Sequence, residues 1–211
     1  MTQPHTITVH CSATLPDWMA DETLWQKRME IHRWHTSPPL NWRAIGYHWL
    51  IDRDGAEIHG RDLDHDEDPW EHTGAHVGGH NTGNLGLCLI GGYGSHEKDA
   101  FLDHFTPEQE AALSKRIEWL RKEFPTIKKV RGHNEYAAKA CPGFRVPDWY
   151  PDARRRYLVG DLRPIDDEAP GGAPERPFSQ ALIDNVAGCR EDAAAMKARL
   201  DLILAKMEAE Q

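Results

Sequence analysis

The chain has 211 residues, of which 39% are hydrophobic and 28% are charged. This length and composition suit one globular domain with an appendage, and they differ from those of a disordered chain. Asp and Glu number 34 against 25 Lys and Arg, which leaves a formal net charge of -9. Proteins that bind nucleic acids generally need a basic surface, so this charge argues against that class.

The sequence indicates neither membrane insertion nor export. No run approaches the ~20 apolar residues that a transmembrane helix needs. The first residues lack the basic and apolar regions of a signal peptide. The cysteines are widely scattered, so we expect no disulfide framework and synthesis in a reducing cytoplasm. They are Cys11, Cys88, Cys141 and Cys189.

The first third of the chain alternates strand and helix patterns. Residues rich in β-branched and aromatic side chains predict three strands, over 6–10, 46–51 and 56–59. Between the first two, residues 21–36 carry apolar side chains at helical spacing. We expect Asp21 to cap the start of this helix and the Pro38-Pro39 pair to end it.

The next segments complete the expected sheet. An apolar run over residues 85–90, bounded by glycines, predicts a buried central strand. Thr106 and Pro107 predict a helix start, and we expect this helix to run to Phe124. Residues 129–131 predict a short last strand. The fold class is therefore α+β, with a central mixed β-sheet flanked by helices.

Composition divides the chain into three parts. Residues 1–160 form the expected catalytic domain, and residues 161–177 are rich in Pro, Gly and acidic side chains, as in a linker. Residues 178–211 predict an amphipathic C-terminal helix. Between 182 and 207 its apolar residues recur at alternating steps of four and three, a heptad pattern that predicts a homo-oligomer or docking to a partner helix. The alternative is one helix that folds back onto the domain.

Three side chains suggest a metal site. His10 ends the first strand, and His133 and Cys141 lie in the loop after the last strand. Imidazole and thiolate are zinc ligands, and a catalytic zinc ion uses three protein ligands. The chain has 13 histidines, however, so a surface or capping role for any one of them stays open on this evidence alone.

Four segments give a more specific indication, because in this order they resemble the zinc-dependent N-acetylmuramoyl-L-alanine amidases of the T7 lysozyme type. These phage enzymes share a fold with the peptidoglycan recognition proteins. The resemblance spans roughly residues 6–150, and the segments are VHCSAT (9–14), IGYHWLIDRDG (45–55), GAHVGGHNTGNLGLCLIGG (74–92) and GHNEYAAKACPGF (132–144).

The resemblance implies a set of functional residues. It makes His10, His133 and Cys141 the ligands of one Zn²⁺ ion, and it matches Tyr47 and Lys139 to the family's catalytic tyrosine and lysine. Non-catalytic relatives typically replace the cysteine, so Cys141 favours an enzyme.

The implied reaction is hydrolysis of the amide between N-acetylmuramic acid and L-alanine in peptidoglycan. A lysine such as Lys139 is suited to stabilising the tetrahedral oxyanion. The hydroxyl of Tyr47 would orient the attacking water or help to move its proton. No Glu stands out as the general base, and its identity stays open.

Three polar residues of these segments have less defined roles. His76 and Asn81 lie in a glycine-rich loop that resembles the family's groove-lining loop, which makes them candidates for substrate binding. The alternative is a tight turn with solvated side chains. We expect His48 to be a structural histidine with satisfied hydrogen bonds.

The resemblance also implies a biological setting. We expect an endolysin made in the host cytoplasm without a signal peptide, which reaches the cell wall after holin-dependent release. Its partner would be peptidoglycan, not a nucleic acid. Two alternatives remain, namely a cytosolic amidase that recycles muropeptides and a non-catalytic peptidoglycan-binding module.

Overall fold

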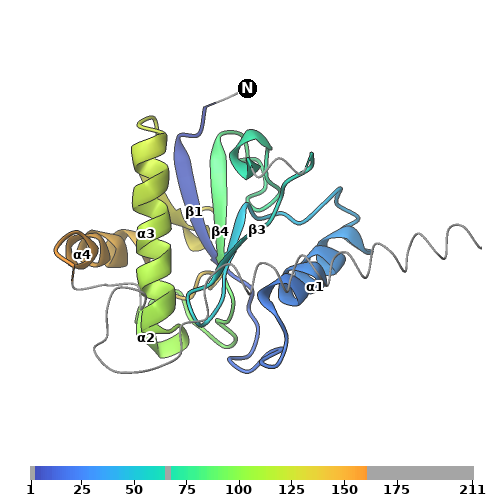
Figure 1. Cartoon of the computed structure of the whole chain (residues 1–211), viewed down its shortest axis with the longest axis horizontal. Coiled ribbons are helices and arrows are strands. Elements are labelled where there is room, and N and C mark those ends of the chain that lie inside the picture. The colour runs from blue at the N-terminus through green and yellow to red at the C-terminus, as the bar shows by residue number, and fades with distance from the viewer. Residues whose placement is uncertain (1–2, 65–67, 161–211) are drawn as a thin grey trace, which may run out of the picture. The chain divides into compact units, whose positions relative to one another are not determined.

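The computed structural model describes residues 3–64 and 68–160, and these contain one mixed five-stranded sheet, as expected (Figure 1). The strand order is β3-β2-β4-β1-β5. Strands β2, β4, β1 and β5 run parallel to one another, and β3 pairs antiparallel with β2. The bounds are Thr6–Cys11 for β1, Trp49–Ile51 for β2, Glu57–His59 for β3, Asn84–Leu89 for β4 and Lys129–Gly132 for β5.

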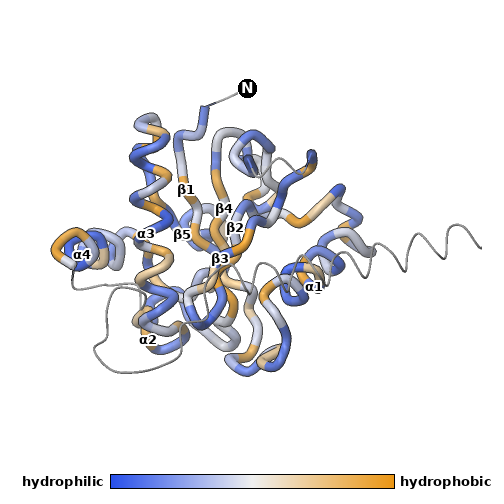
Figure 2. The backbone as a smooth tube through the Cα atoms, viewed as in Figure 1, coloured by the Kyte–Doolittle hydropathy of each residue, from blue (hydrophilic) through white to orange (hydrophobic). Residues whose placement is uncertain are grey.

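Helices cover both faces of this sheet. Helix α1 lies on one side, and α3 and α4 lie on the other (Figure 1). Their bounds are Leu24–Thr36 for α1, Phe101–His104 for α2, Pro107–Glu123 for α3 and Val146–Leu158 for α4, with 3-10 turns at Pro69–Glu71 (η1) and His133–Glu135 (η2). Along α3, hydrophobic and hydrophilic stretches alternate, as expected for a helix with one buried side (Figure 2). None of the helices in the described part is long and apolar enough to cross a bilayer.

The alternation of side chains along β1 separates the main core from the polar face of the sheet. Ile7, Val9 and Cys11 point into the core beneath α3 and α4. Thr8 and His10 therefore point to the opposite face, although both are fully buried. The side of β1 that faces away from the main core thus carries the first candidate ligand.

The structure corrects two predicted boundaries. Thr23, not Asp21, caps α1, because its side chain and that of Gln26 exchange hydrogen bonds with each other's backbone N–H groups in a capping box. Strand β2 begins at Trp49 rather than at residue 46, since the carbonyl of Gly46 accepts the N–H of Ala75 in a loop.

Helix α4 has no counterpart among the predicted elements. Pro147 stands in its first turn and Pro151 lies inside it, so the segment does not have the sequence pattern of an ordinary helix. The predicted linker over residues 161–177 and the predicted helix over residues 178–211 lie outside the described residues.

Candidate functional site

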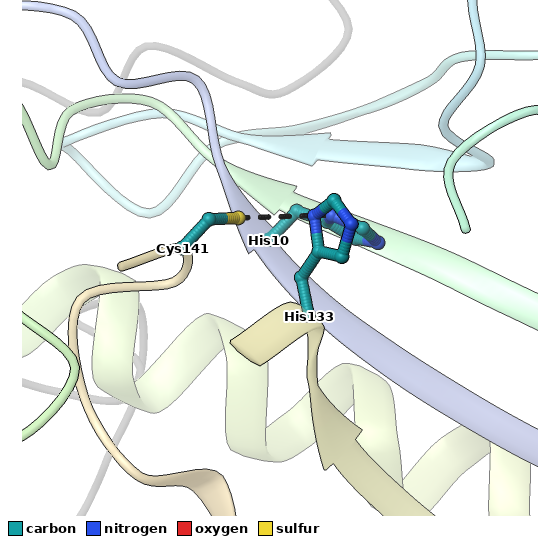
Figure 3. Close-up of side chains that lie close together, drawn as sticks. All are labelled: His10, His133 and Cys141. Carbon is teal, nitrogen blue, oxygen red and sulfur yellow. Dashed lines mark hydrogen bonds between the residues drawn. The ribbon is translucent and has the colours of Figure 1, made fainter. Parts of the chain in front are cut away.

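Parallel pairing places two of the three candidate ligands side by side. His10 is the penultimate residue of β1, His133 follows the last residue of the neighbouring strand β5, and the chain then returns to bring in Cys141 (Figure 3). The three ligand atoms all lie within 4.8 Å of one another. The Sγ atom of Cys141 is 3.7 Å from Nδ1 of His10. The three residues named from the sequence therefore form one cluster.

Backbone hydrogen bonds fix the loop that carries Cys141. The N–H of Asn134 donates to the carbonyl of Cys141 at 2.7 Å. The side-chain amide of Asn134 donates to the carbonyl of Phe144 at 3.1 Å. From the other side, the backbone N–H of Cys11 approaches Sγ of Cys141 at 3.3 Å. The thiol is thus held between β1 and the turn that follows β5.

A second histidine sets the orientation of His10. Nε2 of His76 lies 3.0 Å from the carbonyl oxygen of Asn84, which accepts only, so this nitrogen carries the proton. Burial lowers the pKa of His76 to about 3, so the ring is neutral and its Nδ1 is an acceptor. Nε2–H of His10 donates to that atom at 3.0 Å. The free electron pair of His10 is therefore on Nδ1, which faces Cys141.

The electrostatics of the cluster favour neutral imidazoles. Burial, with a further contribution from His76, lowers the pKa of His10 well below its usual value. Burial also lowers the pKa of His133, and the nearby ammonium of Lys139 adds to this effect. A hydrogen bond with the Cys11 thiol, together with burial, raises the pKa of the Cys141 thiol. In the metal-free protein the imidazoles are ready to bind a cation, and the thiol must first lose its proton.

The two candidate catalytic residues border this cluster. The ring of Tyr47 lies 5.1 Å from the ring of His10. Burial raises the pKa of the Tyr47 hydroxyl well above its usual value, so this group keeps its proton at neutral pH. Lys139 is exposed, two residues before Cys141, and its charge lowers the pKa of both His10 and His133. One protonated hydroxyl and one cation therefore stand beside the three ligands.

The structure gives His76 and Asn81 roles within the protein. His76 is 7% exposed, and both of its ring nitrogens are engaged as described above. The side-chain oxygen of Asn81 accepts the backbone N–H groups of His76 and Val77 at 2.9 and 2.8 Å. Sequence reasoning missed this support of His10 by His76. Substrate binding by either residue stays a prediction.

His48 is a structural histidine, as expected. It is fully buried, its Nδ1 accepts the N–H of Gly86 at 2.8 Å, and its Nε2 lies 2.9 Å from the carbonyl of His72. Within residues 3–64 and 68–160, no Asp or Glu oxygen joins the cluster of His10, His133 and Cys141. Glu135, two residues after His133, accepts the N–H of Gly132 instead.

The donor set suits zinc. Two neutral imidazoles and one thiol that a metal would deprotonate are preferred Zn²⁺ ligands, and three protein ligands leave a coordination position for the reaction. Atoms within 4.8 Å of one another can surround a single ion. The residues therefore fit one zinc ion.

Comparison with known proteins agrees with this geometry. The family model described as N-acetylmuramoyl-L-alanine amidase matches residues 1–144. The chain belongs to this amidase family. Among curated relatives, the endolysin of Enterobacteria phage K11 is 35% identical over 141 residues, which cover 67% of this chain and 82% of the relative. The endolysin of Escherichia phage T7 is 35% identical over 144 residues, which cover 68% and 83%.

Solved structures share the fold. PGRP-SA of Apis mellifera matches with a TM-score of 0.55 at 22% identity, over 71% of this chain and 84% of that one. The amidase LysC from Clostridium intestinale matches with a TM-score of 0.52 at 22% identity, over 74% and 87%. The predicted family, fold class and amidase activity are confirmed by the family and relative matches together with this shared fold.

Proposed function

We propose that this amidase is an endolysin that cleaves the bond between N-acetylmuramic acid and L-alanine in peptidoglycan, with one zinc ion held by His10, His133 and Cys141. The observation that carries the proposal is the convergence of these three ligand atoms within 4.8 Å. When bound, zinc supplies Lewis-acid polarisation of the scissile carbonyl and activation of a water molecule.

The neighbouring side chains supply the remaining chemistry. Lys139, which is exposed at the edge of the site, donates to the oxyanion that forms on the carbonyl oxygen. The Tyr47 hydroxyl keeps its proton, so it acts as a hydrogen-bond donor that orients the water and not as a phenolate base. Asn81 uses its side-chain oxygen within the loop, which leaves its NH₂ group for the substrate. For His76, the two ring hydrogen bonds favour orienting His10 over contacting substrate.

Hydrolysis of purified sacculi tests the proposal. Wild type, Cys141→Ser and chelator-stripped protein are compared with and without added Zn²⁺, and new L-alanine amino termini are counted. We expect these termini from zinc-loaded wild type only. His96→Ala serves as a control, because this side chain is 84% exposed, and it should retain full activity.

Two results would contradict the proposal. Wild type that binds sacculi but releases no amino termini would be a recognition module. Equal activity of Cys141→Ser and wild type would show that the Cys141 thiolate is not a zinc ligand. Preference for soluble muropeptides over sacculi would instead identify a recycling enzyme.

We also propose that the protein reaches the wall from the host cytoplasm by holin-dependent release. The supporting observation is its similarity to the endolysins of phages K11 and T7. Expression in the cytoplasm should lyse cells only when a pore-forming holin is co-expressed. Lysis without a holin would contradict this route.

A further proposal concerns residues 182–207, whose heptad pattern supports self-association or docking to a partner helix. Sedimentation of the full chain should give a mass above that of one copy. Charged substitutions on the apolar seam, Leu200→Asp with Ile203→Asp, should return it to a monomer. A monomeric wild type would contradict self-association and leave the partner helix and the helix folded onto the domain as alternatives.

A further inference from the structure

A cleft of about 550 Å³ is lined by residues from the start of β1, from β5 and from η2, and it plays no part in the chemistry described above. Its walls include Thr6, His80, Lys129, Arg131, Glu135 and Tyr136. We call it the cationic cleft, since two of these residues carry a fixed positive charge. The whole chain has a formal net charge of -9, so a gathering of positive charge is notable here.

Strand register connects the cationic cleft to the site. On β5, Lys129 pairs with Thr6 of β1, and Arg131 pairs with Thr8. Paired residues of neighbouring strands point to the same face, so Lys129 and Arg131 share the face of Thr8 and His10. Two residues after Arg131 comes His133. Thr8 and His10 are buried, so the accessible path runs along the edge strand β5. At roughly 3.3 Å per residue, Lys129 lies about 13 Å and Arg131 about 7 Å from His133.

The two cations are available to a ligand. Within residues 3–64 and 68–160, neither Lys129 nor Arg131 forms an ion pair. The guanidinium of Arg131 lies 5.7 Å from the ring centre of Tyr136, which limits its movement. The ring of His80 lies 5.1 Å from the Tyr136 ring and extends this wall. The carboxylate of Glu135 is engaged by the N–H of Gly132 at 2.7 Å.

We propose that the cationic cleft is a subsite for the free carboxylates of the peptidoglycan stem peptide. This inference rests on the proposed amidase function, because the stem peptide begins at the scissile amide. An extended peptide spans about 3.3–3.6 Å per residue, so its second residue reaches Arg131 and its third or fourth reaches Lys129. Arg131 binds a carboxylate through two parallel N–H donors, and Lys129 adds a point charge at the opening.

The inference is tested by removing positive charge from the cleft and negative charge from the substrate in the same experiment. Arg131→Gln and Lys129→Gln are assayed at low sacculus concentration, on native sacculi and on sacculi whose carboxyls have been amidated with carbodiimide and ammonia. Loss of a hydrogen bond to a charged group costs about tenfold in rate. We therefore expect Arg131→Gln to be about tenfold slower than wild type on native sacculi. On amidated sacculi the two should be equal.

A neighbouring lysine provides the matched control. Lys128 is also exposed, precedes β5 and is not among the residues that line the cleft. Lys128→Gln removes the same charge and should leave both rates unchanged. Lys129 is exposed, so its substitution does not endanger folding, and the unfolding temperature checks Arg131→Gln.

The outcomes separate this inference from the proposed function. Wild-type rates for both Arg131→Gln and Lys129→Gln on native sacculi would overturn it, as would an equal loss on amidated sacculi. If wild type itself releases no L-alanine termini, the proposed function fails, and calorimetry with the free stem tripeptide then decides about the cleft. Binding that is lost in Arg131→Gln and kept in Lys128→Gln supports the subsite, and equal binding by all variants refutes it.

Discussion

The imidazole of His76 stands directly behind that of His10, with 3.0 Å between Nδ1 of His76 and Nε2 of His10. The chain of hydrogen bonds continues to the backbone of β4, since Nε2–H of His76 donates to the carbonyl of Asn84. The side chain of Asn84 is itself fixed, because its oxygen accepts the hydroxyl proton of Thr8 at 2.8 Å. The sheet therefore orients the proposed ligand through His76, which touches neither Cys141 nor His133 by any hydrogen bond in the described structure.

His76→Ala should weaken zinc binding. Partners that orient a histidine ligand typically contribute 10–100-fold to metal affinity, so we expect a loss of about that size. Competition with a chromophoric chelator measures this affinity without any substrate. The readout therefore distinguishes orientation of the metal ligand from contact with peptidoglycan.

The exposed His96 supplies the control for this measurement, and His96→Ala should bind zinc like wild type. Unchanged zinc affinity in His76→Ala together with a raised KM on sacculi would show instead that His76 contacts substrate. That result would restore the role expected from the sequence alone.

Gly86→Ala should damage the same site from β4. A Cβ atom at Gly86 would lie 2.8 Å from the ring of His76, closer than packed atoms allow. Overpacking of this kind costs about 1–3 kcal/mol of stability, and here it also displaces the ring that orients His10. We expect a lower unfolding temperature together with weaker zinc binding.

Gly78→Ala is the matched comparison, because a Cβ atom there meets nothing within 4 Å. This variant should keep both the stability and the zinc affinity of wild type. Equal behaviour of the two alanine variants would mean that the His76 ring can shift without consequence for His10.

The ligand cluster could be predicted from the sequence, whereas the support of His10 by His76 could not. The family resemblance names all three ligands, and the structure shows how two of them meet: His10 is next to last in β1, and His133 follows the end of the neighbouring parallel strand β5. The position of His76 depends on how the loop over residues 74–81 closes onto β4, and hydrophobic periodicity contains no information about that. Gly74 and Gly86 are the sequence features that could have indicated this packing, since a Cβ atom at either position would collide with the His76 ring.

The cationic cleft could not be predicted from the sequence for a related reason. Lys129 and Arg131 are ordinary polar residues of a short strand, and only the register with β1 places them on the face of His10. Sequence patterns predict that β5 is a strand, but they do not predict which strand it pairs with. Helix α4 was not predicted because Pro151 lies within it, and proline inside a helix normally removes a backbone hydrogen bond.

Near pH 7.5, zinc binding should release about one proton more from wild type than from Cys141→Asp, because a thiol must ionise to bind the metal. The raised pKa of Cys141 means that its thiol is protonated in the metal-free protein. The lowered pKa values of His10 and His133 mean that neither imidazole has a proton to lose. Calorimetry in two buffers with different ionisation enthalpies measures the number released.

Cys141→Asp is the informative comparison, since an aspartate is already ionised at that pH, whereas a proton lost by a zinc-bound water is common to both proteins. Equal proton release by the two proteins would show that Cys141 is not a ligand, or that its thiol is already ionised in the free protein.

Mild acid should destabilise the domain through His35, whose ring lies 5.3 Å from that of Tyr47. Its Nδ1 accepts the backbone N–H of Gly46 at 3.0 Å, and burial lowers its pKa from 6.5 to about 4. Between these two values the unfolded chain binds a proton that the folded protein does not. The free energy of unfolding therefore falls as the pH drops from 6.5 to 4, by about 3 kcal/mol from this group in total.

Above pH 6.5 His35 is neutral in both states, and below about pH 4 it is charged in both, so its contribution changes only within that window. Urea unfolding in the presence of a chelator at pH 7.5, 5.5 and 4.5 measures the slope without metal binding. His35→Asn keeps an acceptor for the Gly46 N–H but cannot titrate. Its stability should fall less steeply with acid, by about 1.4 kcal/mol per pH unit inside the window. Parallel slopes for the two proteins would show that His35 is not neutral in the fold.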